Sequence, residues 1–218
     1  NNDNNMKQIL SESDKSYLET RIAEAEKKSM AQIVLATARR CDNYSEIPWK
    51  AFASGASVVA LIVFLTDLFF PVWQTGTLTL LSKVAILAAG IVPALLTVIS
   101  ERFARIFLLR SRKYQETLQY AESLFLSREI FATEGRRCIL ILISRFEKQV
   151  VILPDTGVRD RLSPDVMKNI ISKMTLPLRK KEFRKAFENG LDELLTVLEP
   201  SLPGTEERNE LSNEIIEE

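Results

Sequence analysis

The sequence contains no histidine and only two cysteines, Cys41 and Cys138, among its 218 residues. Without histidine, the Ser-His and Cys-His nucleophile pairs are excluded, and so is the usual imidazole general base. Two cysteines alone do not supply the four ligands of a structural zinc site. Neither standard glycine-rich phosphate-binding motif occurs. These absences remove several common enzyme classes from consideration.

Net charge is also absent, because Lys and Arg total 29 and Asp and Glu total 29. A chain without net charge has no global attraction for nucleic acid, so we expect no nucleic-acid partner. Charge is instead arranged locally, with basic residues after the second long apolar run and acidic residues near the C-terminal end. Residues 1–10 are polar and lack the basic and apolar parts of a secretory signal, so we expect a polar tail there.

Two apolar runs, Phe52–Phe70 and Leu78–Ile99, are about as long as the roughly 20 residues that crossing a bilayer requires. The alternative is a pair of buried soluble helices, but neither run has a polar face, which favours membrane spans. The short link between them carries no charge, so residues 51–100 are predicted to form a transmembrane helical hairpin. Basic residues on both outer flanks place these flanks in the cytoplasm by the positive-inside rule; they are Arg39, Arg40, Lys50, Arg102, Arg105, Arg110, Arg112 and Lys113.

Each apolar run contains a single charged residue, Asp67 in the first and Lys83 in the second. The two lie at similar sequence distances from the tip of the hairpin, and a charge in lipid is costly unless it is paired. We therefore expect an intramembrane Asp67–Lys83 pair, or side chains that reach the nearer interface. A transporter subunit is disfavoured, because an ion path would need more polar residues than these runs contain.

The remaining residues alternate between helical and strand patterns. Helices are predicted over 14–29, 101–131 and 179–198 and from Ser163-Pro164 onward, and strands over 31–38, 137–144 and 148–153. Residues 11–45 supply one helix and one strand, which cannot close a core without residues 101–199. The chain is therefore predicted to be one α/β domain interrupted by the hairpin, and residues 200–218 an acidic mobile tail.

Residues 125–158, FLSREIFATEGRRCILILISRFEKQVVILPDTGV, resemble the TPM domain in its bacterial membrane-anchored branch. The positions in register with the family pattern are Phe125, Leu126, Thr133, Arg136, Glu147, Asp155 and Gly157. The resemblance extends over most of residues 11–198. It departs from the pattern at Phe131, where the family often has histidine, at Ala31-Gln32, where Gly-Glu is frequent, and at Cys138, where glycine precedes the strand.

This resemblance implies a three-layer α/β/α sandwich with a small mixed sheet, interrupted by the two-helix transmembrane hairpin. It also implies an accessory or scaffolding role in the bacterial inner (cytoplasmic) membrane, with the soluble domain and both termini cytoplasmic. Relatives are linked to photosystem II repair and to accessory roles beside membrane receptors. The expected partners are the lipid bilayer and a membrane protein complex or a second copy, with no cofactor. The alternative is a membrane-tethered phosphatase or hydrolase, since acid phosphatase activity and divalent-metal binding have been proposed for some members.

The predicted strand directions collect the candidate site residues at one end of the sheet. A long crossover makes the first two strands parallel, and a tight turn makes the third antiparallel to the second. The starts of strands one and two then lie beside the end of strand three. This end of the sheet holds the candidates for ligand or partner binding, Gln32, Thr133, Arg136, Asp155 and Gly157.

Asp155 has three interpretations at this rim. In the first it is a turn residue pinned by Arg136, with Gly157 adopting a positive φ. In the second it binds a ligand or a metal, although one carboxylate and an amide are a poor set of metal ligands. In the third it is catalytic, but no general base or activated nucleophile accompanies it. The sequence favours the first, so no catalytic residue is assigned.

The same geometry predicts free thiols. Cys41 follows the end of the first strand and Cys138 begins the second, so the two are roughly 20 Å apart at about 3.3 Å per residue. A disulfide requires Cα atoms within about 7 Å.

Overall fold

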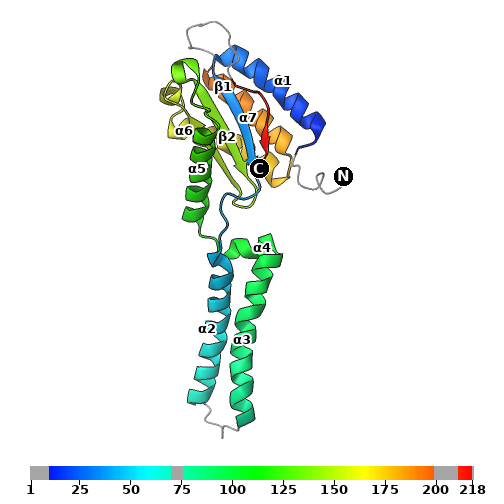
Figure 1. Ribbon diagram of the computed structural model, residues 1–218, viewed down its shortest axis with the longest axis vertical. Helices are drawn as coiled ribbons and strands as arrows, with labels where there is room; N and C mark the ends of the chain where they lie inside the picture. Colours follow the sequence, from blue (N-terminus) through cyan, green and yellow to red (C-terminus); the bar gives the residue numbers. More distant parts are fainter. Residues whose placement is uncertain (1–9, 70–75, 199–210, 218) are drawn as a thin grey trace. The chain divides into compact units, whose positions relative to one another are not determined.

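The computed structural model describes residues 10–69, 76–198 and 211–217 (Figure 1). The chain divides into two compact units, one made of the residues up to Cys41 and from Tyr114 onward, the other of Asp42–Lys113. The first unit is an α/β domain and the second is a helical hairpin with its flanks. The hairpin is thus an insertion, since the chain leaves the domain after Cys41 and re-enters it at Tyr114.

Four strands form one mixed sheet in the order β3-β2-β1-β4. β1 (Gln32–Ala38) runs parallel to β2 (Cys138–Ser144), with Gln32 opposite Cys138. β3 (Gln149–Pro154) is antiparallel to β2, with Pro154 opposite Ile139. These directions agree with the prediction. β1 and β2 read as continuous apolar runs because helices cover both of their faces.

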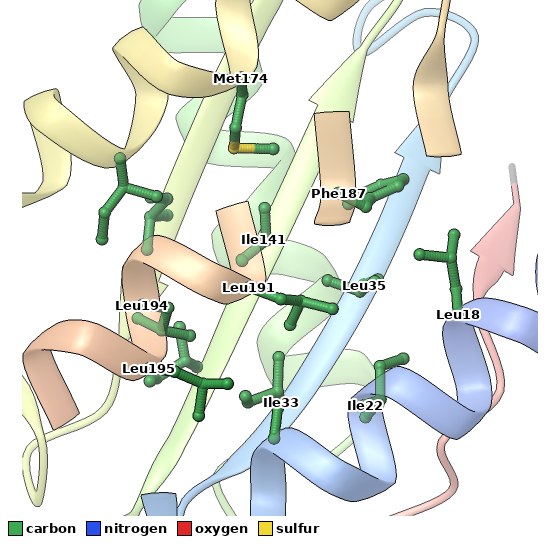
Figure 2. Packing of buried hydrophobic residues seen from close by; sticks show 14 of the residues in the cluster. Leu18, Ile22, Ile33, Leu35, Ile141, Met174, Phe187, Leu191, Leu194 and Leu195 are labelled. Carbon is green, nitrogen blue, oxygen red and sulfur yellow. The ribbon is translucent and has the colours of Figure 1, made fainter. Parts of the chain in front are cut away.

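Three helices, α1 (Glu12–Ser29), α6 (Pro164–Arg179) and α7 (Phe183–Leu198), cover one face of the sheet (Figure 1). Their apolar side chains form one core with Ile33 and Leu35 of β1 (Figure 2). Side chains alternate between the faces of a strand, so the residues between these two point the other way.

The opposite face is covered by α5 (Arg110–Ser127). Its residues Ala121 and Leu124 form a second core with Val34 and Ala36 of β1. Helices on both faces of a four-stranded sheet make the domain a three-layer α/β/α sandwich, as expected.

The continuous helix predicted over 101–131 is wrong. α4 (Glu101–Ala104) and a 3-10 turn, η1 (Arg105–Phe107), precede Leu108, which is extended at φ −95° and ψ 113°. No glycine or proline marks this break, and the extended Leu108 is buried. Burial of its side chain therefore outweighs the local helical preference.

The hairpin consists of α2 (Glu46–Phe69) and α3 (Gly76–Ile99). The helices approach closely at Gly55, where an added Cβ would meet the carbonyl oxygen of Ala89 and would lie 2.9 Å from Cγ of Pro93. A small residue at such a contact allows two backbones to pack directly. Both helices are long and apolar enough to cross a membrane.

The acidic tail predicted over 200–218 is wrong for residues 211–217; residues 200–210 and 218 lie outside the described part of the chain. β4 (Ile216–Glu217) pairs in parallel with β1, with Ile216 opposite Ala36. Ile215 is buried in the core, and the amide of Leu211 donates to Oε1 of Gln32 at 3.0 Å. The apolar residues interspersed with the glutamates explain why this segment packs against the sheet.

Candidate functional site at the rim of the sheet

The rim is the end of the sheet where β3 finishes and β2 begins. Asp155 directly follows β3, and Arg136 lies two residues before β2. Two guanidinium nitrogens of Arg136 donate hydrogen bonds to the Asp155 carboxylate, Nε to Oδ2 at 2.9 Å and Nη2 to Oδ1 at 2.8 Å. The side chain of Asp155 is 3% exposed, whereas that of Arg136 is 53% exposed. The pair therefore has a buried acidic end and a solvated basic end.

Further donors hold the Asp155 carboxylate. The amide of Thr156 donates to Oδ1 at 2.7 Å, and Sγ of Cys138 lies 3.7 Å from Oδ2. Burial by itself would raise the pKa of Asp155, but the Arg136 hydrogen bonds and charge and the Thr156 amide outweigh it and lower that pKa. The carboxylate is thus ionised at neutral pH, with both oxygens already bonded.

Gly157 is required at the rim because of close packing, which differs from the prediction. Positive φ angles occur instead at Gly135 (70°) and Arg136 (52°). This turn presses against Gly157, whose added Cβ would meet the carbonyl oxygen of Gly135 and would lie 2.7 Å from that of Arg136. The Gly157 amide donates to the Arg136 carbonyl at 3.0 Å. The Asp-x-Gly segment therefore clamps the loop that carries Arg136.

Thr133 and Gln32 complete the predicted set. Thr133 is buried, and its carbonyl accepts from the Arg136 amide at 3.0 Å, so it belongs to the same turn. Gln32 lies one strand away, but its side chain binds Leu211 of the C-terminal segment. The structure thus brings Thr133, Arg136, Asp155 and Gly157 together and directs Gln32 elsewhere.

Phe131 occupies the position where the family often has histidine. The Arg136 guanidinium carbon lies 5.7 Å from the centre of the Phe131 ring, within range of a cation–π contact. The rim therefore has an exposed arginine beside a half-buried aromatic ring.

The two cysteines are free thiols, as predicted. Burial and the neighbouring Asp155 charge raise the pKa of Cys138 to about 12. Burial raises the pKa of Cys41 to about 11. Because the thiolate is the reactive form, neither sulfur is a nucleophile at neutral pH.

Within residues 10–69, 76–198 and 211–217, no three His, Cys, Asp or Glu side chains gather to hold a metal ion.

The predicted intramembrane pair is not formed in the described part of the chain, where no ion pair joins Asp67 and Lys83. The helix register explains this. Gly55 faces Ala89 and Gly90 faces Phe52, so Lys83 lies level with a position about seven residues from Asp67. At about 1.5 Å per residue this is an axial offset of roughly 10 Å, beyond direct contact. Similar sequence distances from the tip therefore do not place Asp67 and Lys83 at the same height along the hairpin.

Sequence reasoning missed a second buried carboxylate at the opposite end of the sheet. Glu147 is 1% exposed, shares a short hydrogen bond with the Ser144 hydroxyl, and accepts from the Cys41 amide at 3.0 Å. Glu147 thereby fixes the last residue of the domain before the hairpin insertion. The signal in the sequence was the match of Glu147 to the family pattern.

The sequence profile of the TPM domain matches residues 101–197. The chain contains a TPM domain. The match includes β2, β3 and the whole Asp155 rim, while α1 and β1, which complete the sandwich, precede it. This match identifies the TPM domain and does not distinguish the membrane-anchored branch from other members.

A solved structure has the same fold. The BA42 protein from the psychrophilic bacterium Bizionia argentinensis, determined by NMR, aligns with a TM-score of 0.58 over 98% of each chain at 13% identity. At this identity the likeness concerns the fold alone. No curated protein sequence matches the chain significantly.

Proposed function

We propose that this protein is a membrane-anchored accessory or scaffolding protein whose TPM domain binds a membrane protein complex, or further copies of itself. The observation that carries the anchor is the exposed apolar surface of the hairpin. Phe69 of α2 is 70% exposed and Val98 of α3 is 73% exposed. None of the residues in the most apolar stretch of α2 is buried. In the corresponding stretch of α3, 11% of the residues are buried. A soluble protein rarely exposes so continuous an apolar surface, which lipid chains would cover.

The orientation that we propose is cytoplasmic for the TPM domain and both termini, in a bacterial inner membrane. Basic residues flank the open end of the hairpin, whereas the link between α2 and α3 has none. Trp49, near the start of α2, is 72% exposed, as a residue of an interfacial aromatic belt would be.

The geometry of the rim favours an accessory role over a phosphatase or hydrolase. A hydrolase at this rim would need a carboxylate free to bind a metal or to move a proton. Both oxygens of Asp155 are instead bonded to Arg136, and one also to the Thr156 amide. The pair orders a loop and leaves Arg136 exposed beside the half-buried Phe131.

The anchor and its orientation are tested by labelling single cysteines on intact cells with a membrane-impermeant thiol reagent. Cysteine in place of Thr77, at the closed end of the hairpin, is expected to react, and cysteine in place of Ser111 only after lysis. The native thiols give little background because their pKa values are raised. Labelling of the Ser111 variant alone on intact cells would contradict the orientation, and full extraction of the protein by alkaline carbonate would contradict the anchor.

The accessory role is tested by purification from detergent-solubilised membranes after cross-linking. Wild type is expected to retain a partner, and Asp155→Asn tests whether the rim contributes to its binding. Arg179→Gln is the matched control, because Arg179 is exposed on α6, away from the rim. A purified protein that is monomeric, without partners, and that hydrolyses phosphate esters only while Asp155 is intact would contradict the proposal.

A further inference from the structure

We propose that residues 100–110, the segment that joins α3 to α5, lie in the headgroup layer of the membrane and bind anionic phospholipids. This inference rests on the proposed membrane anchor, because it requires α2 and α3 to cross the bilayer. It goes beyond the positive-inside rule, which gives the orientation of the hairpin but does not assign a lipid-binding surface. We refer to residues 100–110 as the collar segment.

The backbone first turns the collar segment away from the axis of α3 (Figure 1). Ser100 is non-helical, at φ −119° and ψ 107°, and its hydroxyl caps the new helix by accepting from the Phe103 amide at 3.4 Å. η1 then packs against α2. The collar segment therefore stays beside the open end of the hairpin, where the exposed Trp49 also lies.

The apolar side chains of the collar segment differ in exposure, and Phe103 and Phe107 are half-buried. Ala104 and Leu108 are buried within the protein. Ile106 and Leu109 are 72% and 65% exposed. Two large exposed apolar residues next to a membrane span are best covered by the upper acyl chains and the headgroup region, as in interfacial segments.

The charged side chains of the collar segment are Glu101, Arg102, Arg105 and Arg110, so its net charge is positive. Arg102 and Arg110 are exposed, and none of the ion pairs within the described residues involves either of them. Arg112, just beyond, is by contrast neutralised by Asp42 at 3.5 Å and Glu46 at 3.3 Å. Two unneutralised guanidinium groups beside exposed apolar residues match the phosphate of an anionic lipid.

The test uses the full chain in nanodiscs of phosphatidylcholine mixed with phosphatidylglycerol. Spin-labelled lipids measure which lipid is enriched next to the protein. Each near-surface basic residue strengthens association with an anionic leaflet about five-fold. We expect a several-fold preference for phosphatidylglycerol, which falls to near parity in the double variant Arg102→Gln/Arg110→Gln.

The matched control is Arg159→Gln/Arg179→Gln, which removes the same charge from exposed positions of the TPM domain. It is expected to retain the wild-type preference. Equal preference in wild type and in the collar variant would overturn the proposal, and so would equal loss in both variants, because the effect would then be one of total charge.

Depth supplies an independent readout. A nitroxide at Ile106 is expected to collide more with oxygen than with a water-soluble nickel complex, whereas one at Leu126, which is 64% exposed on α5, is expected to do the reverse. Aqueous accessibility at both sites would overturn the collar proposal while leaving the anchor intact. A protein that fails to float with vesicles at all would instead contradict the anchor itself.

Discussion

The two units of this protein arrange their apolar residues in opposite ways. The TPM domain hides them on both faces of a sheet, so Leu35 and Phe187 are inaccessible to solvent. The hairpin exposes its apolar residues, and small residues such as Gly55 form the contact between α2 and α3. Charges follow the same contrast, because the domain buries Asp155 and Glu147 among donors while the hairpin leaves Asp67 and Lys83 exposed. The hairpin therefore exposes the kind of apolar surface that the domain encloses.

The largest effect that tests this contrast is expected from a core truncation in the domain. Phe187 of α7 is fully buried in the core that α7 shares with α1, α6 and the sheet (Figure 2). Phe187→Ala is expected to lower the free energy of unfolding by about 3–5 kcal/mol. Phe64→Ala, on α2 and 61% exposed, is expected to change it by less than about 0.5 kcal/mol in detergent. Chemical denaturation of both variants measures the difference, and equal losses would show that the hairpin surface is packed by protein.

A second prediction concerns a carboxylate that the domain removes from water. Glu26 of α1 is 8% exposed and accepts from the Ile33 amide at 2.8 Å. Burial raises the pKa of Glu26 to about 7 from 4.5. The folded state therefore binds more protons than the unfolded state between these values, so stability falls as pH rises through this window and levels off above it.

Glu26→Gln is expected to abolish this slope and to raise stability at pH 8, by at most about 3 kcal/mol at roughly 1.4 kcal/mol per pKa unit. Glu24→Gln, exposed on the same helix, is the control and should keep the wild-type slope. Denaturation curves at pH 5 and pH 8 provide the measurement. Parallel pH profiles for wild type and Glu26→Gln would show that Glu26 is not protonated in the folded state at pH 5.

A third prediction addresses the hairpin contact. A side chain at Gly55 would overlap Ala89 and Pro93, whereas one at Gly76 would meet nothing within 4 Å. Gly55→Leu is thus expected to cost about 1–3 kcal/mol by overpacking, and Gly76→Leu to be neutral. Thermal unfolding in detergent compares them. Unchanged stability of Gly55→Leu would mean that α2 and α3 do not meet at this glycine.

Local signals predicted much of the fold, because they act within a few residues. Ser11 and Asp14 form the capping box that opens α1, with the Asp14 amide 3.1 Å from Oγ of Ser11. Ser163 caps α6, with Pro164 as its first residue. The strand patterns, the connection lengths and the resulting strand directions followed in the same way.

The features that the sequence did not reveal depend on contacts between distant segments. β4 forms because Ile215 and Ile216 find space against the sheet, and Leu108 breaks a helical pattern because its side chain is buried. At the rim, the pairing of Arg136 with Asp155 was predictable from the sequence, but the burial of Asp155 and the exposure of Arg136 were not. Glycine at position 157 looked like turn chemistry, whereas the approach of residues 135–136 is what requires it.

The smallest effect is expected at the rim, where the two ends of one ion pair differ in exposure. Asp155→Asn keeps an acceptor for the Thr156 amide and leaves a solvated arginine, so it should cost about 1 kcal/mol. Arg136→Gln leaves a buried carboxylate without its cation and should lower the melting temperature at pH 7 further than Asp155→Asn does. The pKa of Asp155, which Arg136 lowers in the wild type, would rise in Arg136→Gln, so the difference in melting temperature between the two variants should narrow as the pH falls toward 4.

Adding Asp155→Asn to Arg136→Gln should restore part of the melting temperature that Arg136→Gln loses, because no unpaired charge remains. Strictly additive melting-temperature shifts would instead mean that water already solvates Asp155, and that the rim resembles the hairpin surface more than the domain core.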